Sequence, residues 1–171
     1  SQSRGERCVE PFPDDLLTKV GIFCDKYHCT MHELLLSVFF WQICILSGQD
    51  DFGVGFPCAN RMSREEQEAV GLFVNTMVLR HKASTTRSFV DHVSAVGQRI
   101  KQAMDHNSVT FSDISHGVSF EKDSHYPTLC QLMFVVQDDF FPDSVGMPFD
   151  VRYMIPDNKT ALFDLVFEVM P

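Results

Sequence analysis

The sequence predicts an α/β fold with a mixed β-sheet flanked by helices. Two patterns carry this prediction: helical and strand segments alternate at first, and strand segments then follow one another toward the end of the chain. The third observation is that 44% of the 171 residues are hydrophobic, including 16 Phe, which is enough to build a core. A body of this length buries about 70% of its unfolded surface, so we expect a single domain over residues 1–171.

Three long helices are predicted from apolar residues at helical spacing. The first begins after residues 11–15, whose acidic side chains suit a first helical turn, and it presents one apolar face. The second begins with a capping box of Thr30 and Glu33 and runs to about Ser47. Because this segment is apolar nearly all round, we expect it to lie in the core. The third helix follows Thr86, and its apolar stripe consists of Phe89, Val93, Val96, Ile100 and Met104.

Five strands are predicted from runs of β-branched and aromatic residues between turn residues. A capping box of Ser63 and Glu66 indicates a short charged helix between the first two strands. The polar segment 105–124 is predicted to be a loop with a short helix, and residues 140–146 a Pro/Gly loop. No closing helix follows the last strand, so we expect the chain to be part of a longer protein. The strands are expected at residues 51–57, 72–79, 129–137, 149–155 and 161–170.

Charge and cysteine content exclude several classes of partner. The net charge of -9 argues against a nucleic-acid partner, because phosphate binding needs clustered Lys and Arg. The apolar run 34–46 is too short to span a bilayer, and the first seven residues do not form a signal peptide, so we expect no membrane association. The six cysteines contain no Cys-x-x-Cys pair, and we expect reduced thiols in a cytoplasmic protein.

The sequence contains no motif for an independent catalytic or metal site. None of the seven histidines adjoin, and none lie in a His-Glu-x-x-His frame that would place two zinc ligands and a general base on one helix. Cys24, His28 and Cys29 lie close together, but no fourth ligand has a spacing typical of zinc sites. The serine elbow Gly-x-Ser-x-Gly is also missing. We therefore predict no bound metal and no complete catalytic constellation.

Several segments of the chain do match the motifs of one family. The string SGQDDFGVGFPCANR spans residues 47–61, and VGLFVNTMVLR spans residues 70–80. HNSVTF at 106–111, PTLCQLMFVVQ at 127–137 and TALFDL at 160–165 follow in order. In this order and spacing the chain resembles the C-terminal lobe of the condensation domains of nonribosomal peptide synthetases. Its Val-Asn-Thr favours a condensation domain over an epimerisation domain, and Thr110 stands where the family usually has proline.

This resemblance implies one lobe of a two-lobe fold like that of chloramphenicol acetyltransferase. The catalytic HHxxxDG motif of the family lies in the N-terminal lobe, and this sequence has no such string, so we expect no catalytic residue here and no activity from the chain alone. The implied reaction is amide bond formation between aminoacyl or acyl thioesters. The substrates would be carried on the phosphopantetheine of carrier proteins, with no cofactor bound directly. The implied partners are the N-terminal lobe, peptidyl carrier proteins and an adjacent adenylation domain.

Three residues acquire expected roles from the same resemblance. Arg61 matches the family arginine that pairs with the motif aspartate across the two lobes, although a solvated arginine is the simpler interpretation. Asn75 and Gln137 are expected to line the substrate channel, with hydrogen bonding at a sheet edge as the alternative. Two other functions stay open: a noncatalytic module that docks carrier proteins or neighbouring domains, and an acyltransferase that uses coenzyme A.

Overall fold

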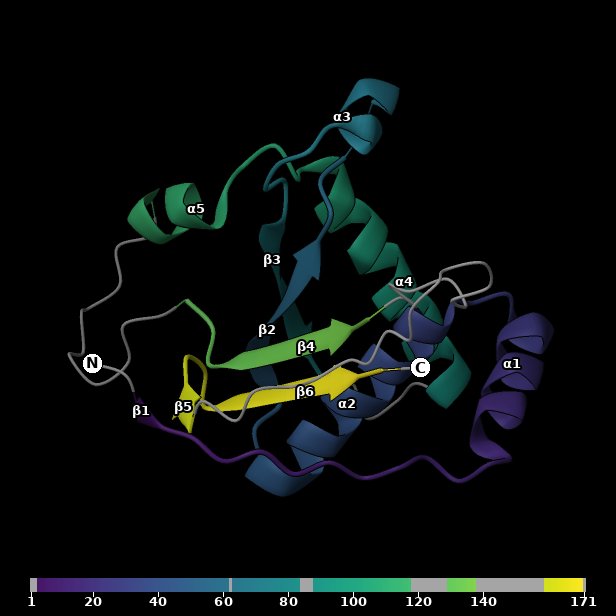
Figure 1. The fold of residues 1–171 in the computed structure, drawn as a ribbon. Coiled ribbons are helices and arrows are strands. Elements are labelled where there is room, and N and C mark those ends of the chain that lie inside the picture. The colour runs from purple at the N-terminus through teal and green to yellow at the C-terminus, as the bar shows by residue number, and fades with distance from the viewer. Residues whose placement is uncertain (1–2, 62, 84–87, 118–128, 138–158, 171) are drawn as a thin grey trace, which may run out of the picture.

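The computed structural model describes residues 3–61, 63–83, 88–117, 129–137 and 159–170. Within these ranges strands and helices alternate and then give way to strands alone, as the α/β prediction requires (Figure 1). The elements are β1 (Ser3–Arg4), α1 (Leu16–Tyr27), α2 (Met31–Ser47), β2 (Asp51–Cys58), α3 (Arg64–Glu68), β3 (Asn75–Lys82), α4 (Phe89–Asp105), α5 (Phe111–Gly117), β4 (Leu132–Val136), β5 (Thr160–Ala161) and β6 (Leu165–Val169).

The main sheet has the strand order β3-β2-β4-β6 and mixes both directions, which confirms the prediction of a mixed sheet. β2 and β3 form a long antiparallel pair, from Asp51 opposite Lys82 to Cys58 opposite Asn75. β4 runs parallel to β2 and to β6, because long crossover segments separate these strands in the chain. A second, two-stranded sheet joins β1 to β5 near the N-terminus (Figure 1).

The hydrophobic core lies between the main sheet and the two long helices α2 and α4. Figure 1 shows both helices on the same side of the sheet, with α1 at the edge of the molecule. Phe40 of α2, Val54 of β2 and Phe134 of β4 are completely buried at the centre. The α4 stripe also packs here, with Val96 in the core cluster and Ile100 against it. The core therefore joins three strands to two helices.

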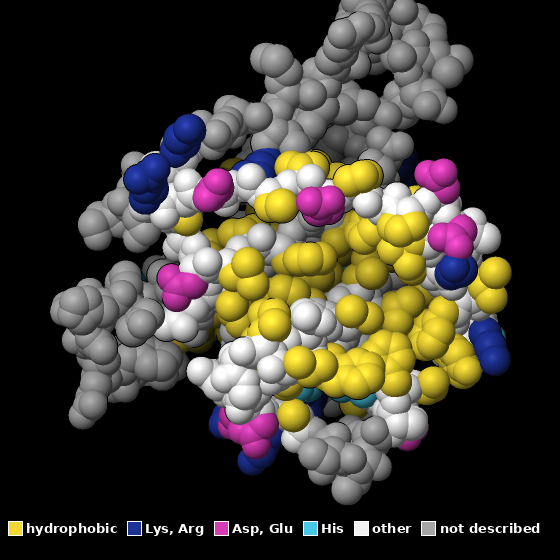
Figure 2. Space-filling model, turned by 90° about the horizontal axis from the view of Figure 1, so that it is seen from below, with side chains coloured by type: hydrophobic (Ala, Val, Ile, Leu, Met, Phe, Trp, Pro, Cys, Tyr) yellow, Lys and Arg dark blue, Asp and Glu magenta, His cyan; other side chains and the backbone are white. Residues whose placement is uncertain are grey.

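The predicted start and end of α2 are confirmed, but only one of its faces lies in the core. Thr30 and Glu33 make both hydrogen bonds of the capping box, and Gly48 ends the helix in the left-handed conformation with φ +68°. One face of α2 is buried as expected. The other face is exposed, with Trp41 54% and Leu46 72% accessible. Figure 2 shows a broad area of hydrophobic side chains on the side of the molecule where α2 lies.

Two further expectations about the strands need correction, and the pairing partners explain both. β3 begins at Asn75 rather than residue 72, because Asn75 is the last residue that pairs with β2. The expected strand 161–170 is divided, because β5 pairs with β1 whereas β6 pairs with β4. α1 forms as predicted, but none of its residues is buried. The expected strand 149–155 and loop 140–146 lie outside the described residues.

No single helix in the described part of the chain is long and apolar enough to cross a membrane. α1 and α2 together pass this test by length and composition, but their axes are bent by 104° relative to each other.

Candidate functional site

A pocket of about 540 Å³ opens where β2 ends and β3 begins. Its walls come from the loop after β2, the segment that leads into β3, and the start of α5. Segments that are far apart in the sequence therefore meet here. The lining residues are Asn60, Leu72, Phe73, Val74, Asn75, Thr76, Thr110, Phe111 and Ser112.

Asn75, predicted to line a channel, is a buried residue at this pocket that holds the wall together. Its amide nitrogen donates to the backbone oxygens of Asn107 and Val109, at 3.1 and 3.0 Å. Its amide oxygen accepts a hydrogen bond from the backbone N–H of Phe111 at 3.2 Å. Both ends of the side chain thus bind the segment between α4 and α5. A buried backbone carbonyl without a hydrogen-bond partner lowers the stability of the fold. By binding these groups, Asn75 holds that segment against β3.

Arg61, predicted to make an inter-lobe contact, lies beside the same pocket and binds the end of α3. One guanidinium nitrogen, Nη1, donates to the backbone oxygens of Glu66 and Ala69, the latter at 2.7 Å, and Nη2 donates to that of Gly71 at 3.1 Å. Carbonyls at the end of a helix lack partners within the helix, and Arg61 supplies donors for them. The guanidinium also lies 4.2 Å from the ring centre of Phe73, a pocket residue. Arg61 therefore supports one wall of the pocket.

Gln137, the third predicted site residue, lies at the end of β4 and bonds to β6. Its side-chain amide donates to the carboxylate of Glu168 at 2.7 Å, and its backbone N–H donates to the backbone oxygen of Val169 at 2.9 Å. Among the described residues that line the pocket, Gln137 does not appear. The structure thus brings Arg61 and Asn75 together at one site and leaves Gln137 outside it.

Thr110 is a pocket residue whose structural role was not predicted from the sequence. Its hydroxyl donates to the carboxylate of Asp113 at 2.7 Å and accepts from the Asp113 backbone N–H at 3.1 Å. The backbone N–H of Thr110 also donates to this carboxylate, at 3.2 Å, and the two hydrogen bonds that the carboxylate accepts from Thr110 lower the pKa of Asp113. The spacing of Thr110 and Asp113 is typical of a helix N-terminus, and this signal could have placed the start of α5.

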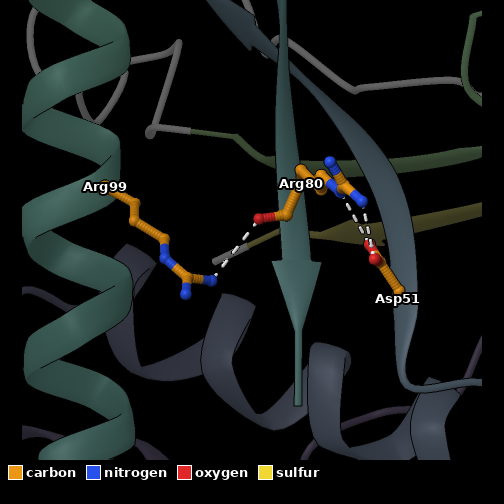
Figure 3. Close-up of polar contacts among 3 residues, drawn as sticks. All are labelled: Asp51, Arg80 and Arg99. Carbon is orange, nitrogen blue, oxygen red and sulfur yellow. Dashed lines mark hydrogen bonds and ion pairs between the residues drawn. The ribbon is translucent and has the colours of Figure 1, made fainter.

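At the opposite end of the β2–β3 pair, charged residues of two motif segments bind each other (Figure 3). The Arg80 guanidinium donates to both carboxylate oxygens of Asp51, each at 2.7 Å. The hydrogen bond from Arg80 lowers the pKa of Asp51, and the nearby positive charges act in the same direction. Arg99 of α4 donates to the backbone oxygen of Arg80 at 3.4 Å, so it ties this helix to β3.

His81 is a buried histidine within the core rather than a site residue. Its ring stacks on Phe40 with the ring centres 4.5 Å apart, and the ring of His92 approaches edge-on at 5.2 Å. Burial lowers the pKa of His81 to about 4, and the charges of His92 and Arg99 act in the same direction. The described residues include no group of three His, Cys, Asp or Glu side chains placed to hold a metal.

Comparison with known proteins identifies the family. The family model described as the condensation domain matches residues 2–171. The chain belongs to the condensation domain family. Condensation domains are acyltransferase-like domains that form peptide bonds in nonribosomal peptide synthetases.

Curated relatives of this condensation domain are bacterial peptide synthetases. The chain is 28% identical to bacitracin synthase 2 of Bacillus licheniformis over 163 residues, which is 92% of this chain and 6% of that protein. It is 24% identical to tyrocidine synthase 2 of Brevibacillus parabrevis over 165 residues, 96% of this chain and 5% of that protein. The chain therefore spans only a small part of the relatives that it matches.

Solved structures share the fold of this condensation domain. The four-domain nonribosomal peptide synthetase AB3403, bound to AMP and glycine, superposes with a TM-score of 0.70 at 22% identity, covering 73% of this chain and 10% of that one. The condensation domain from the monacolin K polyketide synthase MokA superposes with a TM-score of 0.67 at 20% identity, covering 80% of this chain and 30% of that one. Both likenesses concern the fold.

Three of the family's motif segments lie together in the structure of this condensation domain. The segments 47–61, 70–80 and 106–111 each contribute residues to the pocket. The segment 127–137 supplies β4, which pairs with the far side of β2. Three motifs that are separated in the chain therefore form one site.

Proposed function

We propose that the chain is the C-terminal lobe of a condensation domain and forms one wall of the channel in which amide bonds are made. The substrates would be aminoacyl or acyl thioesters on the phosphopantetheine of peptidyl carrier proteins. The observation that supports this proposal is the pocket at the Asn75 end of β3, where three motif segments meet. The catalytic HHxxxDG motif would come from the N-terminal lobe.

The chemistry of the pocket supports a binding role rather than proton transfer. Its described lining has amide and hydroxyl groups beside apolar side chains, and it includes no carboxylate and no imidazole. A general base must lie within hydrogen-bond reach of the proton that it takes. A phosphopantetheine arm carries amide groups and apolar carbon atoms, which such a lining can bind. The chain would therefore position the thioester while the other lobe supplies the base.

The exposed rim of the pocket supports a contact with the N-terminal lobe. Leu72 and Val74 line the pocket and are 92% and 57% exposed, and Val70 and Val109 beside it are also exposed. Clustered apolar side chains on a surface commonly mark an interaction site. Arg61 lies next to this rim, and we propose that its guanidinium also meets the aspartate of the HHxxxDG motif in the assembled domain.

The exposed face of α2 supports a second domain contact. Its exposed apolar side chains include Val38, Trp41 and Ile45. Figure 1 shows α2 at the end of the molecule away from α3 and α5, next to which the pocket lies. We propose that an adjacent adenylation domain covers this face in the full synthetase.

The six cysteines are free thiols in the structure, which supports a cytoplasmic setting for that assembly.

The test is a condensation assay with loaded carrier proteins, in which the dipeptidyl product on the acceptor carrier is measured. We expect no product from the chain alone and product when the N-terminal lobe is present. Within the intact domain, Ser112→Trp should fill the pocket and lower the rate about tenfold or more, because small displacements of a substrate are costly. Ser108→Trp is the matched control, since Ser108 is exposed and does not line the pocket.

Two results would contradict the proposal. Product formed by the chain alone would show that it holds its own catalytic group. Equal rates for the Ser112 variant and the control would show that the pocket takes no part in the reaction. Carrier binding without product from the intact domain would favour a noncatalytic module that docks carrier proteins. Acyl transfer from free coenzyme A thioesters would favour an acyltransferase that uses coenzyme A.

A further inference from the structure

The corner between α1 and α2 brings two cysteines together through its backbone geometry. His28 follows the last turn of α1 with φ +54°, in the left-handed conformation. The backbone N–H of Cys29 donates to the backbone oxygen of Cys24 at 3.2 Å. This bond spans six residues and is the outer bond of a Schellman motif, and the backbone N–H of His28 donates to the same Cys24 oxygen. In that motif the side chains of the first and sixth residues commonly contact each other.

The two side chains that this motif brings together are both thiols. Both residues are partly accessible to solvent. Burial raises the pKa of Cys24 to about 11, and the neighbouring Cys29, Asp25 and Glu33 act in the same direction. A thiol held in its protonated form is a poor nucleophile, so reaction with an oxidant should begin at Cys29.

We infer that Cys24 and Cys29 form a dithiol that closes reversibly to an intramolecular disulfide when it meets a low-molecular-weight disulfide. The inference does not depend on the proposed function of the domain. It rests on the backbone geometry of the corner, which places the two cysteines at the first and sixth positions of a helix-ending motif.

The exchange proceeds in two balanced steps. The Cys29 thiolate attacks one sulfur of the small disulfide, forms a mixed disulfide and releases one small thiolate. This step removes the charge of the Cys29 thiolate, which is one of the causes that raise the pKa of Cys24. Cys24 then loses its proton, attacks the Cys29 sulfur and releases the second small thiolate. Two electrons pass from the protein to the small disulfide, and two protons go to the released thiolates.

The disulfide would stiffen the attachment of α1. Cys24 lies in the last turns of α1, and Cys29 directly precedes Thr30, the N-cap of α2. α1 has no buried residue, and Phe23 meets Phe89 of α4 with ring centres 6.0 Å apart. A covalent bond at this corner would limit the opening of α1, which lies at the edge of the molecule (Figure 1).

The test uses the intact natural protein that contains this chain, with oxidised glutathione as the probe. After treatment under native conditions and alkylation, the peptide that spans residues 24–29 should have lost two hydrogen atoms and should resist alkylation until a reductant is added. Amide hydrogen exchange in α1 should be slower in the oxidised protein. Cys29→Ser should abolish the internal bond, whereas Cys8→Ser, the matched control at an exposed thiol, should leave it intact.

Two variants of His28 separate the geometry from mere proximity in the sequence. His28→Gly favours the left-handed conformation and should keep the rate of closure, and His28→Val disfavours it and should slow closure several-fold. Closure in the folded protein should be about tenfold faster than in urea. The inference is overturned if glutathione adducts accumulate on Cys24 or Cys29 without an internal bond. It is equally overturned if closure is no faster in the folded protein.

Discussion

Arg80 and Asp51 form a bidentate ion pair at the open end of the β2–β3 pair, with two N···O distances of 2.7 Å (Figure 3). Each residue belongs to a different motif segment of the family, and 29 positions separate them in the chain. The pair lies at the end of the strands opposite the pocket. We therefore attribute the presence of these two residues in the motifs to the register of the strands and not to contact with a substrate.

Replacing Arg80 by lysine should weaken this pair without affecting the pocket. Lysine keeps the charge but lacks the planar fork, so only part of the interaction should remain. The hydrogen bond from Arg80 lowers the pKa of Asp51, so the stabilisation is present above the unfolded value of 3.8 and is lost as the pH falls through the lowered folded value. We expect a small decrease in melting temperature at pH 7 that vanishes in strong acid.

The control for Arg80→Lys is Asp51→Asn, alone and combined with it, in thermal unfolding at low and high salt. Because the Arg80 side chain is largely exposed, high salt should reduce the difference between the variants. Additive effects of the two changes would show that the ion pair contributes nothing to stability.

Because of His81, the protein should be less stable in mild acid than at neutral pH. Burial lowers its pKa to about 4 from 6.5, so the unfolded chain binds more protons than the folded one between these values. Stability should therefore be complete above pH 6.5 and fall as the pH decreases toward 4. Between pH 7 and pH 5 we expect a loss of about 2 kcal/mol in the free energy of unfolding.

His81→Phe should remove this pH dependence, because phenylalanine keeps the stacking on Phe40 and cannot bind a proton. Urea unfolding at several pH values measures the slope, and His116→Gln, a change at an exposed histidine, is the control. A slope that persists in the His81 variant would assign the acid sensitivity to another group.

Asn75→Ala should destabilise the pocket wall and the whole domain. It leaves the backbone oxygens of Asn107 and Val109 and the N–H of Phe111 without the amide that binds them. We expect a loss of about 2–3 kcal/mol in the free energy of unfolding, measured in urea.

Asn75→Asp tests the direction of these hydrogen bonds. An aspartate keeps the acceptor for Phe111 but places a second acceptor against two carbonyl oxygens, so it should be at least as destabilising as alanine at pH 7. If Asn75→Asp were as stable as the wild type, the amide orientation described here would be incorrect.

Arg61→Ala should lower the stability of the chain by itself, by about 1–2 kcal/mol, because three backbone oxygens at the end of α3 lose their donor. Arg61→Lys should restore part of this loss. If Arg61 also pairs with the motif aspartate of the N-terminal lobe, the loss should be larger in the intact domain. Melting temperatures of the chain and of the intact domain measure the two effects separately, and equal losses would restrict Arg61 to its own lobe.

The sequence by itself determined the elements whose signals are local. The capping boxes of Thr30 with Glu33 and of Ser63 with Glu66 placed α2 and α3, because these hydrogen bonds join residues three positions apart. The same holds for Gly48, whose left-handed conformation ends α2. The motif segments also indicated the family and two residues of the site region, Arg61 and Asn75.

The tertiary structure alone decided what depends on distant partners. The start of β3 at Asn75 and the division between β5 and β6 follow from strand pairing, which no short segment specifies. The exposure of Trp41 depends on which neighbours cover α2, and its hydrophobicity could not reveal that. The pocket exists because Asn75 binds a segment more than 30 positions away, and such a contact leaves no periodic trace in the sequence.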